Sequence, residues 1–266
     1  MSDNPITVKK LLEMKQAGQK IACLTSYDAS FTHLIEAAGV DVLLVGDSLG
    51  MVVQGQESTL PVTVDEMIYH TRNVSRARQR ALLVADMPFM SYRSPTLALE
   101  SAGRLMKEAG AHMVKLEGGA ARLESVRQLA SQGIPVCGHL GLLPQSVHKL
   151  GGYRVQGRQA EVADAIAKDA LALQEAGADM LVLECVPASL AAEITRGLSI
   201  PVIGIGAGAG TDGQVLVLYD MLGMNPHPPR FVKNFLGEAG SIQHALQAYV
   251  EAVRTGAFPT EGQSFK

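Results

Sequence analysis

Eight short apolar runs, most of them separated by segments with helical periodicity, limit the possible folds of this chain more than any other feature. The runs are nearly continuously apolar, which is typical of parallel strands covered on both faces. They span residues 21–27, 42–47, 82–87, 113–118, 136–140, 180–185, 202–205 and 215–219. In a chain of 266 residues, eight such strands predict an α/β fold, a (β/α)8 TIM barrel forming one domain over residues 1–266. An open, doubly wound sheet is the alternative.

A weak internal repeat favours the barrel. Residues 36–47, 108–117 and 175–184 each read as a helix end, a glycine, a buried strand and then a carboxylate at the strand's carboxyl end. Between the seventh and eighth runs only residues 206–214 remain, too few for a full helix. Residues 50–62 show no periodicity, which is typical of an active-site loop.

Boundary signals define the helices. Thr63 and Glu66 form a capping box, and Ser94 precedes a proline suited to the first helical position. We expect an extra N-terminal helix over residues 7–16, a C-terminal helix over 241–254 and a polar, loosely held tail over 258–266. Two aspartates, Asp28 and Asp220, are interpreted mainly as helix N-caps.

Composition excludes several classes of protein. The 23 Lys and Arg against 26 Asp and Glu give a formal net charge of −3, which argues against a nucleic-acid-binding surface. No apolar run approaches the ~18–20 residues needed to cross a bilayer, and the first residues do not read as a signal peptide. Three cysteines in apolar runs indicate buried thiols in a reducing compartment, so we expect a cytoplasmic protein without membrane or nucleic-acid partners.

Five of the apolar runs end in a side chain that can bind a metal or move a proton. These are Asp47, Asp86, Glu117, His139 and Glu184. In a barrel the carboxyl ends of the strands meet at one face, where active sites lie. Converging carboxylates repel one another, and a divalent cation would offset that repulsion. The first three offer only oxygen ligands, which suit Mg²⁺; a hydrogen-bonded acidic cluster without metal is the alternative.

Lys115 and Glu117 lie two residues apart on one predicted strand, so their side chains share a face. We expect Lys115 to neutralise a substrate carboxylate; a buried ion pair is the alternative. Glu184 ends an apolar run and is the candidate general base.

Two glycine-rich segments carry weaker signals. Residues 208–213 match G-x-G-x-x-G but precede a strand instead of following one, so they are no dinucleotide-binding motif. The wider run 204–213 suits either a phosphate cradle or close backbone packing. The loop over residues 141–158 carries His148, Lys149, Arg154 and Arg158, which suggests contact with an anionic ligand or simple solvent exposure.

At the level of motifs, the chain resembles the ketopantoate hydroxymethyltransferase family along nearly its whole length. The matching motifs include Val45-Gly-Asp-Ser-Leu-Gly50, Ala85-Asp-Met-Pro-Phe89, Val114-Lys-Leu-Glu-Gly-Gly119, Val136-Cys-Gly-His-Leu-Gly141, Leu183-Glu-Cys-Val-Pro187 and Ile203-Gly-Ile-Gly-Ala-Gly208. The resemblance implies a cytoplasmic barrel of the phosphoenolpyruvate/pyruvate type, assembled as a homodecamer. It also implies transfer of the one-carbon unit of 5,10-methylenetetrahydrofolate to C3 of 3-methyl-2-oxobutanoate, which gives 2-dehydropantoate for pantothenate biosynthesis.

Residue by residue, the resemblance implies that Asp47 and Asp86 bind Mg²⁺ and that Glu117 completes the metal's surroundings. It implies that Asp47, Ser48, Asp86 and Lys115 contact the oxo acid and that Glu184 accepts the proton. His139 is a weaker candidate for a contact near the folate or the enolate. The chemistry is consistent, because a metal chelated by the oxo acid would stabilise the enolate that forms when the C3 proton leaves.

Two other functions remain open at this point. A related Mg²⁺-dependent barrel that cleaves or rearranges oxo acids would use the same chemistry, although the cysteines lie inside strands and not in a reactive loop. A non-catalytic ligand-binding barrel is the second alternative.

Overall fold

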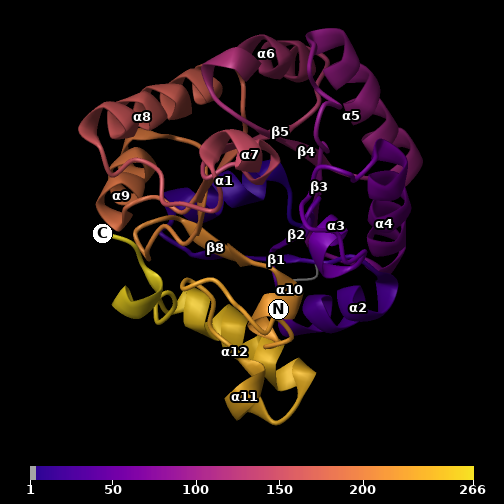
Figure 1. Cartoon of the computed structure of the whole chain (residues 1–266). Helices are drawn as coiled ribbons and strands as arrows, with labels where there is room; N and C mark the ends of the chain where they lie inside the picture. Colours follow the sequence, from indigo (N-terminus) through magenta and orange to yellow (C-terminus); the bar gives the residue numbers. More distant parts are fainter. Residues whose placement is uncertain (1–3) are drawn as a thin grey trace.

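Eight parallel strands close into a barrel in chain order, with β8 paired to β1 (Figure 1). The structure is a computed structural model that describes residues 4–266. The strands are β1 (Ile21–Thr25), β2 (Val42–Val45), β3 (Leu82–Asp86), β4 (Met113–Glu117), β5 (Val136–Gly141), β6 (Met180–Glu184), β7 (Val202–Ile205) and β8 (Gly213–Leu216). The predicted (β/α)8 barrel is therefore confirmed, and the open-sheet alternative is wrong.

Helices form an outer layer around the strands. They are α1 (Val8–Gln16), α2 (Ala29–Ala38), α3 (Leu49–Val52), α4 (Val64–Ala77), α5 (Pro95–Ala109), α6 (Leu123–Ser131), α7 (Val147–Leu150), α8 (Ala160–Glu175), α9 (Ala188–Gly197), α10 (Leu218–Met221), α11 (Leu236–Ala239) and α12 (Ile242–Arg254). Three short 3-10 helices are η1 (Ala120–Arg122), η2 (Pro144–Ser146) and η3 (Glu261–Gln263). None of the helices within residues 4–266 is both long enough and apolar enough to pass through a membrane.

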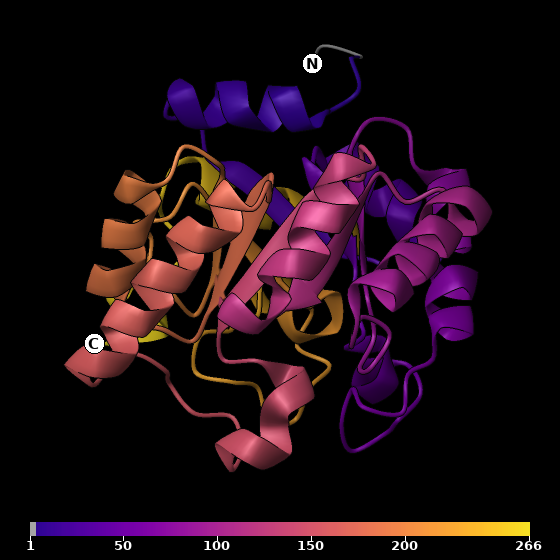
Figure 2. The same cartoon turned by 90° about the horizontal axis from the view of Figure 1, so that it is seen from above.

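The two ends of the barrel differ. Figure 2 shows α1 lying across one end, with α7 at the opposite end. The Lys15 ammonium holds α1 in place through Asp212 Oδ2 at 2.6 Å and the carbonyl of Thr195 at 2.9 Å. The end under α1 is closed, so a ligand must enter at the other end, where the strands reach their carboxyl termini.

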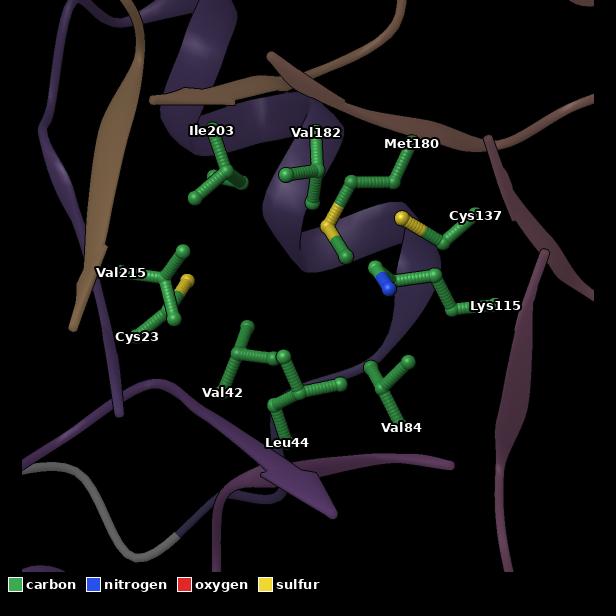
Figure 3. A pocket seen from close by; sticks show the side chains of 10 residues that line it. All are labelled: Cys23, Val42, Leu44, Val84, Lys115, Cys137, Met180, Val182, Ile203 and Val215. Atoms are coloured by element: carbon green, nitrogen blue, oxygen red, sulfur yellow. The ribbon is translucent and has the colours of Figure 1, made fainter. Parts of the chain in front are cut away.

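The barrel axis is packed with side chains (Figure 3). Neighbouring strands are in a register that puts Cys23 beside Val42 and Leu44 beside Val84. The space left between the inward side chains is about 10 Å³, enough for about one water molecule. Among residues 4–266, Lys115 is the only charged side chain that lines this space, and its ammonium points into the interior. A ligand therefore cannot occupy the centre of the barrel.

Most of the predicted helix boundaries are confirmed. The Thr63–Glu66 capping box is complete, and Ser94 caps α5 with Pro95 in the first turn. Asp28 caps α2 by accepting a hydrogen bond from the amide of Phe31 at 2.9 Å. The expected N-terminal and C-terminal helices are present as α1 and α12. All three cysteines are buried and free.

Three predictions about the C-terminal part are wrong. The eighth strand begins at Gly213 instead of residue 215, because Gly213 already pairs with both neighbouring strands. Asp220 lies inside α10 and caps no helix. The tail is not loosely held: Phe258 is 3% exposed, and the carbonyl of Phe265 accepts a hydrogen bond from the Ala188 amide at 2.9 Å.

Candidate active site

A cavity of about 670 Å³ opens at the carboxyl ends of the strands. Its wall includes every side chain that the sequence singled out as a site residue, and we name this set the acidic half of the cavity: Asp47, Ser48, Asp86, Lys115, Glu117, His139 and Glu184. The opposite wall is built by residues after β8, and we name it the C-terminal half: Asp220, Asn225, His227, Arg230, Phe231 and Phe265.

Strand register explains how the acidic half comes together. Asp86 on β3 lies beside Lys115 on β4, and Glu117 on β4 lies beside His139 on β5. Residues two apart on a strand share a face, so Lys115 and Glu117 both point inward. Because β2, β3, β4, β5 and β6 are consecutive neighbours in the barrel, their last residues line one side of the mouth.

Lys115 and Asp86 form a buried ion pair. The ammonium donates a hydrogen bond to Asp86 Oδ1 at 2.8 Å, and both side chains are almost fully buried. Burial lowers the pKa of Lys115, but the charges of Asp86, Glu117 and Asp47 more than compensate, so its pKa lies above its usual value. Lys115 is therefore a permanent positive charge at the floor of the cavity.

The carboxylate of Asp47 is surrounded mainly by other carboxylates. Its backbone amide donates to Asp86 Oδ2 at 3.1 Å, which brings the two carboxylates close together. Burial raises the pKa of Asp47 well above its usual range, and the carboxylates of Asp86 and Glu117 raise it further. A cation bound between these carboxylates would offset their mutual repulsion.

Gln145, which the sequence reasoning missed, connects the acidic side chains to one another. Its side-chain amide donates to Asp47 Oδ2 at 2.8 Å and to the carbonyl of Met87 at 3.0 Å. Its backbone amide donates to Glu117 Oε2 at 3.1 Å, and its side-chain oxygen accepts from the Tyr92 hydroxyl. The Tyr92 oxygen in turn accepts from the Glu117 amide, so every polar group of Gln145's side chain has a fixed partner.

Gln145 gives a first testable prediction. Gln145→Leu leaves the carboxylate of Asp47, the carbonyl of Met87 and the hydroxyl of Tyr92 without their partner, and each unpaired buried group costs about 1–3 kcal/mol. We expect Mg²⁺ affinity to fall about 10- to 100-fold, since outer residues that orient metal ligands have effects of that size. Titration calorimetry with Mg²⁺ measures it. Gln128→Leu, which removes a surface hydrogen bond to Glu124, is the control; equal affinities in the two variants would contradict the prediction.

His139 lies between two carboxylates. Its Nε2 is 3.2 Å from Glu184 Oε2, and its Nδ1 is 3.5 Å from Glu117 Oε1. Both ring nitrogens are buried, and neither makes a hydrogen bond of good geometry. Burial and the charge of Lys115 lower the pKa of His139, but the two carboxylates outweigh them and raise it. His139 can therefore place a positive charge beside Glu184.

The backbone conformation around Glu184 is constrained. The carbonyl of Glu184 accepts from the Leu142 amide at 2.8 Å, and the next residue, Cys185, has a left-handed φ of 49°. Such a conformation costs a non-glycine residue roughly 1–2 kcal/mol. Strain of this kind gathers at functional sites because the surrounding structure has to hold it in place.

Gly141 gives a second prediction. Its φ of 92° suits glycine, and a Cβ there would lie 2.2 Å from the carbonyl oxygen of Glu184. Gly141→Ala must therefore displace the chain at Glu184, and we expect a loss of about 1–3 kcal/mol in the free energy of unfolding together with a fall in turnover. Denaturant unfolding and steady-state assays measure the two effects. Gly133→Ala, at an equally left-handed glycine with open space around it, is the control for the strain alone.

Ser48 is positioned by Tyr27, a residue that does not belong to the acidic half. The hydroxyl of Tyr27 lies 2.8 Å from Ser48 Oγ, and the Tyr27 ring stacks on Tyr219 at 5.7 Å between ring centres. Tyr27 ends the first apolar run, a signal that the sequence reasoning missed, whereas no spacing pattern connects Tyr92 to the site.

The donor set suits Mg²⁺ bound partly by water. No group of three or more His, Cys, Asp or Glu side chains within residues 4–266 is arranged to hold a metal ion on its own. Mg²⁺ usually keeps several waters and takes only one or two carboxylates plus substrate oxygens. Asp47 and Asp86 supply such a pair, and the Asp47 amide, which donates to Asp86 Oδ2 at 3.1 Å, keeps the two residues together.

The structure distinguishes between the alternatives for the glycine-rich run 204–213 but not for the basic segment 141–158. In the run 204–213, added Cβ atoms at Gly208, Gly210 and Gly213 would meet neighbouring atoms at 2.3–2.7 Å, which supports the close-packing interpretation. In the loop 141–158, Tyr153 and Val155 line the cavity, whereas all four basic side chains are exposed. Contact of that loop with an anionic ligand stays a hypothesis.

Solved structures share the barrel. Phosphoenolpyruvate phosphomutase from Streptomyces platensis matches with a TM-score of 0.62 over 82% of this chain and 83% of its own, at 14% identity. An oxaloacetate acetylhydrolase in complex with 3,3-difluorooxalacetate matches with a TM-score of 0.61 over 83% of each chain, also at 14% identity. A 2,3-dimethylmalate lyase of the PEP mutase/isocitrate lyase superfamily matches with a TM-score of 0.58, over 79% of this chain and 77% of its own, at 16% identity. These structures and this chain thus share the TIM-barrel fold.

Sequence comparison identifies the family, which the similarity to solved structures does not. Two proteins named 3-methyl-2-oxobutanoate hydroxymethyltransferase are 59% identical (Halorhodospira halophila, 100% of this chain and 96% of that protein) and 62% identical (Alkalilimnicola ehrlichii, 98% and 95%). The family model described as ketopantoate hydroxymethyltransferase matches residues 5–261. The chain therefore belongs to the ketopantoate hydroxymethyltransferase family.

Proposed function

We propose that this enzyme transfers the one-carbon unit of 5,10-methylenetetrahydrofolate to C3 of 3-methyl-2-oxobutanoate and releases 2-dehydropantoate. The observation that carries the proposal is the arrangement of the acidic half, where Glu184 and the Asp47–Asp86–Lys115 group line one cavity. The relatives' names support the hydroxymethyl transfer to the oxo acid. The folate co-substrate is inferred from the family resemblance, and the enolate chemistry from the residues of the acidic half.

The oxo acid binds beside Lys115 and Ser48. The permanent positive charge of Lys115 attracts the substrate carboxylate, although Asp86 already shares that charge. The hydroxyl of Ser48, oriented by Tyr27, can donate a hydrogen bond to a substrate oxygen. Asp47 and Asp86 would hold Mg²⁺, which when bound supplies Lewis-acid polarisation of the substrate carbonyl and makes the C3 proton more acidic.

Glu184 is the proposed base. It lies at the end of β6 on the cavity wall, and its side chain is only 14% exposed, so bulk water competes little for the proton. His139, at 3.2 Å, can place its positive charge beside the Glu184 carboxylate and stabilise it before the transfer. The carbanion formed at C3 then attacks the methylene carbon. The bonds from that carbon to the folate nitrogens break, and a water molecule supplies the hydroxyl oxygen and the protons, so that 2-dehydropantoate and tetrahydrofolate are released.

A lyase or mutase reaction on a related oxo acid is the second candidate, since two fold relatives are named a lyase and a phosphomutase. Cys185 lies one residue past β6 and lines the cavity, in contrast to the expectation that all cysteines lie inside strands. Burial and the charge of Glu184 raise the pKa of its thiol, so a nucleophilic thiolate is disfavoured. The hydroxymethyl transfer is the better supported of the two.

Product analysis tests the proposal. The purified chain is incubated with 3-methyl-2-oxobutanoate, 5,10-methylenetetrahydrofolate and Mg²⁺, and the mixture is analysed by mass spectrometry. We expect 2-dehydropantoate and tetrahydrofolate in equal amounts, and loss of both after chelation of the metal. Cleavage of an oxo acid without consumption of the folate would favour the lyase alternative instead.

The homodecamer and the cytoplasmic location implied by the family resemblance remain predictions. Analytical ultracentrifugation of the full chain measures the assembly state directly.

A further inference from the structure

The cavity is larger than the oxo acid requires. A volume of about 670 Å³ is typical of sites for drug-sized ligands, and a small branched oxo acid fills only part of it. The acidic half accounts for that substrate and for Mg²⁺. The C-terminal half has no role in the binding described so far, although it forms a continuous wall of the same cavity.

Asp220 is the unusual member of the C-terminal half. It is only 7% exposed, and it is neither a helix cap nor part of an ion pair. Its Oδ1 accepts a hydrogen bond from the side-chain amide of Asn225 at 3.0 Å. Among residues 4–266 its Oδ2 has no hydrogen-bond partner, so one oxygen of a largely buried carboxylate is free to face a ligand in the cavity.

The orientation of the Asp220–Asn225 pair is fixed. Asn225 Oδ1 accepts from the backbone amide of His227 at 2.9 Å, which turns the amide nitrogen of Asn225 toward Asp220. Burial raises the pKa of Asp220, whereas the hydrogen bond from Asn225 lowers it. A ligand that brings further N–H donors would stabilise the charged carboxylate, because a buried anion with a single donor is incompletely paired.

Two aromatic rings belong to the same wall of the cavity. Phe231 and Phe265 both line the cavity, and both pack on Gly206, where a Cβ would lie 2.8 Å from the Phe231 ring and 3.1 Å from that of Phe265. The guanidinium of Arg230 lies over the Phe265 ring, 5.8 Å from its centre. A planar heterocycle can stack on such a wall.

A chain of side-chain contacts connects the helix that carries Asp220 to Ser48 in the acidic half. Tyr219, the neighbour of Asp220 on α10, stacks on Tyr27, and Tyr27 contacts Ser48 (Figure 1 shows α10 beside β1). Asp220 and Ser48 line the same cavity, so a flat ligand anchored at Asp220 has room to extend toward the oxo acid at Ser48.

From these contacts we infer that Asp220, with Asn225 behind it, binds the aminopyrimidinone edge of the reduced folate. That edge presents a ring N–H and an amino N–H side by side, and a carboxylate accepts both in the same way as it accepts a guanidinium. The nitrogen that carries the one-carbon unit lies on the far side of the pterin from this edge, and so faces the acidic half. This inference rests on the proposed function, because it assumes a folate co-substrate.

The test compares Asp220→Asn with the wild-type enzyme. Asparagine keeps an oxygen for the hydrogen bond from Asn225 and replaces only the ligand-facing oxygen by a donor, so the loop is retained. The probes are tetrahydrofolate, 6-methyltetrahydropterin and p-aminobenzoylglutamate, each titrated by calorimetry into the Mg²⁺-loaded enzyme with 3-methyl-2-oxobutanoate present.

We expect the dissociation constants for tetrahydrofolate and 6-methyltetrahydropterin to rise about 10- to 100-fold in Asp220→Asn, because a charged hydrogen-bonded pair becomes a clash between donors. The weak binding of p-aminobenzoylglutamate should not change. Asp28→Asn is the matched control, since Asp28 lies near Tyr219 and asparagine caps a helix as well as aspartate. It should bind all three probes as the wild type does.

Two results would overturn the inference in different ways. Wild-type affinity for tetrahydrofolate in Asp220→Asn, with an unchanged melting temperature, would remove Asp220 from the folate site and leave the proposed function intact. No binding of tetrahydrofolate to the wild-type enzyme would reject the folate co-substrate itself, and this inference with it.

Discussion

Glu184→Gln should lower turnover by about 10²- to 10⁴-fold and leave the affinity for 3-methyl-2-oxobutanoate nearly unchanged. A positioned general base contributes about that factor, and glutamine has the size of glutamate but cannot take a proton. Glu184 makes no contact with Lys115 or Asp86 that would tie it to substrate binding. Steady-state kinetics and calorimetry with the oxo acid measure the two quantities separately.

Glu193→Gln, the same change at an exposed position on α9, serves as the control and should retain full turnover. If Glu184→Gln also retained full turnover, Glu184 would not be the base. A parallel loss of oxo-acid affinity would assign Glu184 to substrate binding instead.

Asp86→Ala should abolish Mg²⁺-dependent binding of the oxo acid, with a loss of about 100-fold or more in metal affinity. It also leaves the buried ammonium of Lys115 without its hydrogen-bond partner. Removing one member of a buried ion pair typically costs 3–5 kcal/mol of stability. Calorimetry with and without Mg²⁺ measures the binding, and thermal unfolding measures the stability.

The two effects of Asp86→Ala can be separated by a double variant. Asp86→Ala with Lys115→Met removes the unpaired charge, so we expect stability to recover in part while Mg²⁺ affinity stays low. Asp164→Ala, at an exposed position on α8, is the control for the loss of a carboxylate alone. Oxo-acid affinity in Asp86→Ala that still responded to Mg²⁺ as in the wild type would contradict the assignment of Asp86 as a metal ligand.

The barrel and the acidic half could be predicted because their signals lie in the strands. A parallel strand buried on both faces is a continuous apolar run, so the polar residue that ends it, such as Asp86 or Glu184, is conspicuous. The barrel then requires that all such residues meet at one face. Register adds the detail that Asp86 lies beside Lys115.

The remaining parts of the site could not be predicted, because loops supply them. Gln145 lies in η2 after β5, and Tyr92 lies on a turn after β3. Their shared hydrogen bond depends on how these two segments fold back over the mouth. Asp220 was interpreted as a cap because it follows an apolar run, but the strand ends at Leu216 and a short helix intervenes. The tail contains few apolar residues, yet Phe258 and Phe265 alone suffice to pack it.

The most direct test of the proposed chemistry is deuterium exchange at C3 of 3-methyl-2-oxobutanoate, followed by NMR in D₂O with and without Mg²⁺. It isolates the enolising step from the transfer of the one-carbon unit. We expect rapid exchange that requires the metal and is lost in Glu184→Gln. Absence of exchange with Mg²⁺ present, both without folate and with tetrahydrofolate added, would contradict the account that the acidic half removes the C3 proton.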